Sequence, residues 1–175
     1  PQLVDAWTTR FDLLLKLNRP REILLLLAAL NWPQGVPVSL RQYECLAFRA
    51  DRQGEAAYLR LNALIDEAPN QYPLRRLLAD WYDQDDDNEA YLAAGRELVR
   101  IAPDFAPAHG YVGHALAKLE RDDEAVQSFE RAYTLDGEYH FAGARLLERY
   151  VPRQRYKEAQ KIKKKLWAHE QSVAI

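Results

Sequence analysis

The sequence predicts an all-helical fold of about five antiparallel helix pairs. Apolar residues recur at helical spacing along most of the chain, and no segment keeps the period of two that a strand would show. Residues that end helices recur every 34 residues (103 − 69 = 34), which indicates a repeated structural unit. These positions are Gly35, Pro69, Pro103 and Gly137.

Two further sets of positions keep the same spacing, and both hold apolar residues. Small residues in the second set suit close contact between paired helices. The first set is Leu30, Leu64, Leu98, Ala132 and Leu166; the second is Ile23, Ala57, Tyr91, Ala125 and Ala159.

Each helix is predicted from its own apolar stripe and from the residues that end it. Pro20 suits the first turn of a helix, where its missing N–H costs little. Leu74, Leu78 and Trp81 lie on one face of the helix expected at residues 72–84. Gly137 suits the end of a helix. The helices are expected at residues 2–17, 20–31, 38–51, 54–67, 72–84, 88–101, 106–119, 122–135, 139–151 and 154–170.

The fourth repeat resembles the tetratricopeptide repeat (TPR), whose pattern is W-x₂-L-G-x₂-Y…A-x₃-F…P. Gly113 stands at the glycine of the pattern, and Ala125 with Phe129 matches A-x₃-F, while His109 takes the place of the tryptophan. The second and third repeats match in part and the first and fifth match least. The repeats are expected at residues 1–37, 38–71, 72–105, 106–139 and 140–175.

The resemblance implies a right-handed α-solenoid of TPR-like helical hairpins, in which the first helices line a concave groove. Small residues at Cys45, Ala79 and Gly113 agree with it, because they let the helices of a hairpin approach closely. Stacking then buries the open face of each hairpin on the next. We expect residues 1–175 to form one such domain, as a segment of a longer chain, because the sequence contains no methionine.

Composition excludes several classes of protein. The chain has 24 basic and 26 acidic residues, so its net charge of −2 gives no overall attraction to nucleic acid or to an anionic membrane. Its longest apolar run has eight residues (23–30), against about 20 for a transmembrane helix. The compartment stays open, with the cytoplasm favoured over the periplasm.

No catalytic or metal-binding motif is present, so no enzyme activity and no cofactor are predicted. Cys45 has no base near it in sequence and is expected to be a buried, inert thiol. The acidic run 83–87 lacks the glycine and glutamate of a calcium loop. We expect Asp86 and Glu89 to cap the following helix instead.

We therefore predict a non-enzymatic adaptor or scaffold that binds a peptide or protein segment, or another part of its own chain, in the groove. The carboxylate clamp of some TPR proteins is absent, since Thr8 and Asp12 stand where its first Lys and Asn would be. The alternative is polyanion binding through the basic helix 154–170. The groove residues expected to bind are Tyr43, Arg49, Arg76, Asp80, Tyr111, His114 and Lys118.

Overall fold

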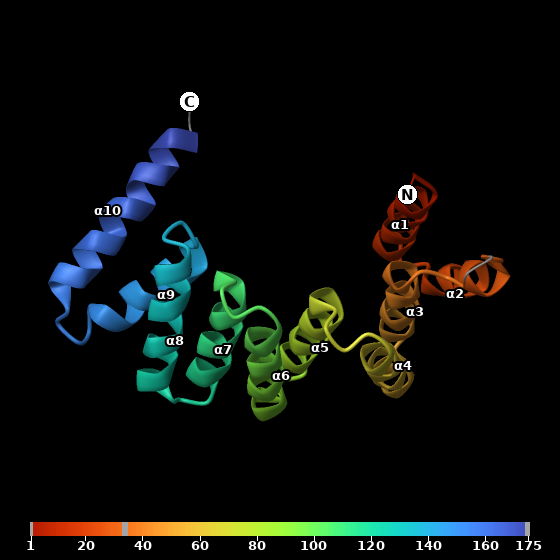
Figure 1. The fold of residues 1–175 in the computed structure, drawn as a ribbon, viewed down its shortest axis with the longest axis horizontal. Coiled ribbons are helices and arrows are strands. Elements are labelled where there is room, and N and C mark those ends of the chain that lie inside the picture. The colour runs from red at the N-terminus through yellow and green to blue at the C-terminus, as the bar shows by residue number, and fades with distance from the viewer. Residues whose placement is uncertain (1, 33–34, 174–175) are drawn as a thin grey trace. The chain divides into compact units, whose positions relative to one another are not determined.

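The structure is a computed structural model that describes the backbone of residues 2–32 and 35–173 and the side chains of residues 3–32 and 35–166. Within these ranges the chain forms ten α-helices and no strand (Figure 1). Every observed helix end lies within three residues of the predicted end, which confirms the all-helical prediction. The helices are α1 (Gln2–Lys16), α2 (Pro20–Ala29), α3 (Val38–Ala50), α4 (Gly54–Glu67), α5 (Tyr72–Gln84), α6 (Asn88–Ile101), α7 (Ala106–Lys118), α8 (Asp122–Leu135), α9 (His140–Tyr150) and α10 (Tyr156–Val173).

The turn inside each helix pair repeats the 34-residue spacing in its backbone geometry. In every one of these turns a residue other than glycine adopts a positive φ, between 55° and 61°. The amide of the next residue donates to the carbonyl five positions earlier, at 2.8–3.0 Å, which is the long hydrogen bond of a Schellman motif. All five repeats therefore share one turn, including the first and last, where the sequence resemblance is weakest. The left-handed residues are Asn18, Arg52, Asp86, Glu120 and Gln154.

Packing divides the chain into two compact units, called here unit 1 (Pro1–Leu74) and unit 2 (Arg75–Ile175). The division falls inside α5. Consecutive helices contact one another from α1 to α4 in unit 1 and from α6 to α10 in unit 2, as expected for stacked hairpins. The single domain expected over residues 1–175 stays a prediction.

Unit 1 has an aromatic core between α1, α2 and α3. Phe11, Ile23 and Leu40 are fully buried there. The ring of Phe11 lies 5.5 Å from the ring of Trp7 and 5.4 Å from the ring of Tyr43, centroid to centroid. Burying each large side chain of this kind contributes about 1.5–3 kcal/mol.

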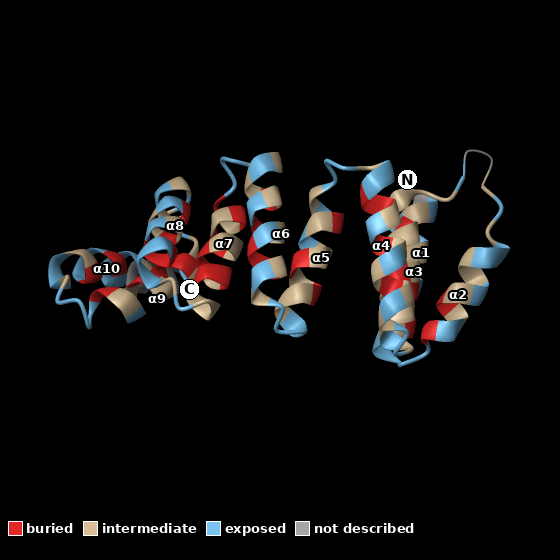
Figure 2. Cartoon of the chain, turned by 90° about the horizontal axis from the view of Figure 1, so that it is seen from below, coloured by how far each residue is buried: buried red, intermediate tan, exposed pale blue. Residues whose placement is uncertain are grey.

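Unit 2 is a series of helices in contact from α6 to α10. Along them, buried and exposed residues alternate as expected for helices that bury one face (Figure 2). Gly113 on α7 shows how close the approach is, because a Cβ there would lie 2.7 Å from the ring of Phe129 on α8. The small residue predicted at this contact is thus required by the packing.

Candidate functional site

In unit 2, residues of α5, α6 and α7 and the segment that begins α9 surround a hollow of about 240 Å³, which we call the aromatic hollow. Its wall holds three tyrosines and a phenylalanine together with two carboxylates. α5 supplies the acids, α6 one tyrosine, and α7 the residues opposite them. The lining residues are Asp80, Asp83, Tyr91, Gly110, Tyr111, His114, Tyr139 and Phe141.

A tyrosine–aspartate hydrogen bond joins α7 to α5 at the hollow. The hydroxyl of Tyr111 donates to Oδ1 of Asp80 at 2.6 Å, and Arg76 Nε lies 3.9 Å from Oδ2. Burial raises the pKa of Tyr111, so its hydroxyl keeps the proton that it donates. Burial also raises the pKa of the Asp80 carboxyl, and the hydrogen bond from Tyr111 opposes that shift.

His114 stands between two aromatic rings one helical turn along α7. Its Nδ1 lies 3.3 Å from the hydroxyl of Tyr91. The rings of Tyr91 and Phe141 meet it edge-on, at centroid distances of 5.8 Å and 5.7 Å. Burial lowers the pKa of His114 below its ordinary 6.5, so the imidazole is neutral at pH 7.

Gly110 leaves the space that Tyr139 fills. A Cβ at Gly110 would lie 2.6 Å from the hydroxyl oxygen of Tyr139, closer than real Cβ contacts come. The ring of Tyr139 in turn lies 5.9 Å from the ring of Phe141. Glycine on α7 therefore positions the aromatic wall that comes from the start of α9.

Lys118 lies outside the lining of the hollow and pairs with one of its carboxylates. Its Nζ lies 2.9 Å from Oδ1 of Asp83 and 3.0 Å from Oδ1 of Asp86. These contacts join the end of α7 to the end of α5 and to the turn that follows it.

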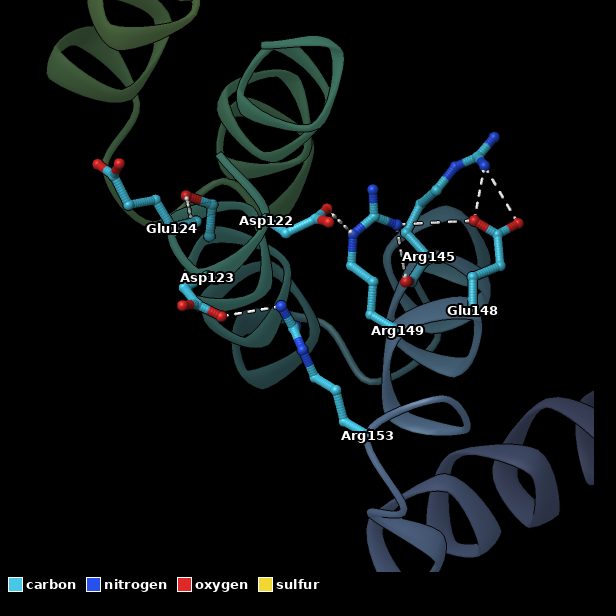
Figure 3. A network of polar contacts seen from close by, with 8 residues as sticks. Asp122, Asp123, Glu124, Arg145, Glu148, Arg149 and Arg153 are labelled. Atoms are coloured by element: carbon cyan, nitrogen blue, oxygen red, sulfur yellow. Dashed lines mark hydrogen bonds and ion pairs between the residues drawn. The ribbon is translucent and has the colours of Figure 1, made fainter. Parts of the chain in front are cut away.

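Ion pairs hold α9, and with it Phe141, against the N-terminal end of α8 (Figure 3). Arg149 Nε lies 3.3 Å from Asp122 Oδ1, and Arg149 also donates to the carbonyl of Arg145 at 3.1 Å. Arg153 contacts Asp123 at 2.8 Å. These arginines therefore have structural contacts within unit 2.

The structure divides the seven residues predicted to bind. Asp80, Tyr111 and His114 come together in the aromatic hollow, and Arg76 and Lys118 form ion pairs with its two carboxylates. Their role in binding stays a prediction.

Tyr43 and Arg49 belong to unit 1, and the prediction that Tyr43 faces an open groove is wrong. Only 6% of Tyr43 is exposed, because its ring packs on Phe11 and its hydroxyl donates to Asp12 Oδ1 at 2.7 Å. The guanidinium of Arg49 lies 5.6 Å from the ring centre of Tyr58.

Sequence reasoning missed five residues of the hollow. One signal was available: Tyr91 stands in the 34-residue set that otherwise holds alanines and isoleucine, so a large polar-tipped side chain there was unusual. The other four meet only through packing between helices. They are Asp83, Gly110, Tyr139 and Phe141.

The predicted cap of α6 is also wrong by one residue. Asp87 caps the helix, and its Oδ1 accepts from the amide of Ala90 at 3.1 Å. Asp86 cannot take that role because it is the left-handed residue of the preceding turn.

Cys45 is fully buried, as predicted for a packing thiol, and burial raises its pKa to about 12. Within the described ranges, no three side chains of the His, Cys, Asp or Glu type are grouped to hold a metal ion. No helix in the described part of the chain has the length and apolar character needed to cross a membrane.

Unit 1 contains a larger hollow of about 540 Å³ between α2, α3 and α4. Its charged residues have partners in the same unit: Arg60 Nε lies 2.7 Å from Glu44, and Arg41 lies 2.7 Å from Glu67 Oε1. Its wall is otherwise largely apolar, through residues such as Leu24.

The basic segment 153–165 is partly engaged within unit 2. Arg153 pairs with Asp123, Arg155 pairs with Glu130 at 2.9 Å, and Lys165 lies 5.7 Å from the ring centre of Tyr133. On α10, the side chains of Lys157, Lys161 and Lys164 are exposed.

No protein-family model and no curated protein matches the sequence. Solved structures of MamA match the fold over nearly the whole chain. MamA from Desulfovibrio magneticus RS-1, residue 41 to the end, is 17% identical with a TM-score of 0.70, covering 97% of this chain and 96% of that one. A MamA RS-1 double mutant is 18% identical with a TM-score of 0.72, and the match covers 97% of this chain and 95% of that one. MamA of AMB-1 is 18% identical with a TM-score of 0.65, and the match covers 96% of this chain and 92% of that one. The chain therefore has an all-helical repeat fold of the TPR type.

Proposed function

We propose that this chain is a non-enzymatic protein-interaction module that binds a peptide or protein segment at the α5–α7 face of unit 2, around the aromatic hollow. The observation that carries the proposal is the hollow itself. It gathers tyrosine, histidine and carboxylate side chains, most of them on first helices of consecutive repeats, around one open hollow.

The composition of the hollow suits protein recognition. Tyrosine gives a large contact area with few rotatable bonds and carries a hydrogen-bonding hydroxyl, so it is enriched at binding hot spots. Tyr111 and His114 are only partly buried, and Tyr139 and Phe141 stand beside them. Repeat folds use such faces as extended binding surfaces.

The chemistry of the chain supports binding rather than catalysis. A catalytic cysteine needs thiolate character and access, and Cys45 has a raised pKa and no exposed surface. His114 contacts the hydroxyl of Tyr91, whose own pKa burial raises, so this pair does not form an activated nucleophile.

Selection from a random-peptide library on the immobilised chain tests the proposal, followed by calorimetry of the selected peptides on variants. Tyr111→Ala should weaken binding by roughly 1 kcal/mol or more, as hot-spot truncations do. Tyr156→Ala is the matched control, because Tyr156 is 57% exposed and lies on α10. Peptides that bind the Tyr111→Ala variant normally would contradict the proposal.

Polyanion binding through α10 is the second candidate. It is favoured by the exposed lysines at 157, 161 and 164, whose spacing of four and three places them on one helix face. Replacing the three by alanine should then abolish retention on a polyanion. Binding of that kind weakens steeply with salt, whereas binding in the aromatic hollow should respond weakly.

A further inference from the structure

We infer that the aromatic hollow receives the cationic side chain of an arginine or a lysine in the bound peptide. This inference rests on the proposed function and adds the chemical class of the residue that enters the hollow.

The size of the hollow fits one side chain. Sites for small molecules and cofactors measure roughly 300–1,000 Å³. The aromatic hollow measures about 240 Å³, so it is small for such a ligand. It opens on the face proposed for peptide binding, where a single projecting side chain can enter.

The charge of the wall selects a cation. Of the eight lining residues, Asp80 and Asp83 are acidic and none is a lysine or an arginine; the bases that pair with them, Arg76 and Lys118, lie outside the lining. His114 adds no charge at pH 7, since burial lowers its pKa. Burial is the main cause of the raised pKa of Asp80; the charge of Asp83 adds to the shift and the charge of Arg76 opposes it.

The rings of the wall suit the stem and head of such a side chain. Ring faces attract a guanidinium or ammonium within about 6 Å of their centres. Unit 2 already uses this contact, because the guanidinium of Arg145 lies 5.3 Å from the ring centre of Phe141. Tyr91 and Tyr111, at 6.1 Å and edge to face, form the adjoining wall with Tyr139.

The bases that now pair with Asp80 and Asp83 can give way to a cation of the ligand. Arg76 is 58% exposed at its side chain and lies 3.9 Å from Asp80, which is a loose pair in contact with water. Lys118 bridges Asp83 and Asp86, so it keeps Asp86 when a ligand cation shares Asp83.

Nuclear magnetic resonance titrations of the whole chain test the inference with four probes. N-acetyl-arginine amide and N-acetyl-lysine amide carry the charge; N-acetyl-citrulline amide and N-acetyl-norleucine amide are their neutral counterparts. The charged probes should shift backbone amides of residues 110–114 and 139–141, and the neutral ones should not. The first two probes distinguish arginine from lysine.

Variants then identify the carboxylates. Asp83→Asn and Asp80→Asn should each lower the affinity for the charged probes by about tenfold, because each removes one charge-assisted hydrogen bond. Asp12→Asn is the matched control, because Asp12 accepts the same tyrosine hydrogen bond in unit 1, and it should leave binding unchanged. Since both hollow aspartates are partly exposed, the variants should fold, and their amide spectra show whether they do.

Two results would overturn the inference. One is equal binding of charged and neutral probes; the other is no shift near the hollow with any probe. Neither decides the proposed function, because the library selection does not presuppose a cation. Selected peptides whose binding depends on Tyr111 but which contain no basic residue would support the proposed function and contradict the inference of a bound cation.

Discussion

The same tyrosine–aspartate pair occurs in both units, two repeats apart (111 − 43 = 68 and 80 − 12 = 68). Tyr43 donates to Asp12 at 2.7 Å, and Tyr111 donates to Asp80 at 2.6 Å. In unit 1 the tyrosine is part of the core, whereas in unit 2 it lines the aromatic hollow.

The neighbours of the pair explain the difference. Moving 68 residues back from Asp83, Tyr91 and His114 gives Leu15, Ile23 and Leu46. Ile23 is fully buried in the core of unit 1, and the two leucines pack against that core. One repeat position can therefore serve packing in one unit and a polar hollow in the other, so the repeat pattern identifies the position but not its use.

The largest effect should come from the apolar position that both units share. Leu64 and Leu98 are 34 residues apart, and both are fully buried. Leu64→Ala and Leu98→Ala should each lower the free energy of unfolding by roughly 2–5 kcal/mol, because each leaves a cavity. Chemical denaturation measures this, and losses below about 0.5 kcal/mol would show that the position is not structural.

Replacing a glycine by alanine should have a smaller effect on stability, and the effect should differ between the two units. Gly113→Ala forces a methyl group to within 2.7 Å of Phe129 and should destabilise unit 2 by roughly 1–3 kcal/mol. Gly54→Ala in unit 1 meets nothing within 4 Å and should be neutral or should stabilise α4 by up to about 1 kcal/mol. Thermal unfolding of the two variants compares them, and equal losses would contradict the close contact of α7 with α8.

Removing the two hydroxyls tests the shared pair directly. Tyr43→Phe and Tyr111→Phe should each cost about 1 kcal/mol of stability, the net value of one hydrogen bond. Only Tyr111→Phe should also weaken selected peptides, since Tyr43 is buried. Peptide affinity that falls equally in both variants would remove the distinction between the units.

The smallest effect concerns pH. The pKa of His114 is lowered by burial, so the unfolded chain binds more protons and stability is lost as pH falls below 6.5 toward the folded-state pKa. Asp83 opposes this shift, while Arg145, Lys118 and Arg149 add to it. His114→Leu, which places the unit 1 residue in unit 2, should flatten this part of the stability profile. If the stability of His114→Leu and of the parent chain falls equally steeply between pH 7 and pH 5, the buried, neutral imidazole is contradicted.

The helices and their repeat followed from the sequence because terminators and small residues keep a fixed spacing. The turn residues did not, since Arg52 and Glu120 adopt a left-handed backbone that neither residue type favours. The cap of α6 was misplaced by one residue for the same reason: the left-handed Asp86 shifts the capping position to Asp87.

The candidate site was only partly predictable. Asp80, Tyr111 and His114 could be found because they lie on first helices at repeat positions. Tyr139 could not, because its place depends on the missing side chain of Gly110, which is a contact between two helices. Tyr43 was misjudged because the repeat register does not show that α1 brings Phe11 over it.

The central claim is that binding occurs at the aromatic hollow of unit 2 and not at its counterpart in unit 1. Mapping amide shifts with a library-selected peptide on the whole chain tests this claim most directly. The account predicts shifts at residues 80–83, 110–114 and 139–141, with residues 12–15 and 42–46 unchanged. Shifts confined to residues 12–15 and 42–46, or to residues 156–166 of α10, would contradict it.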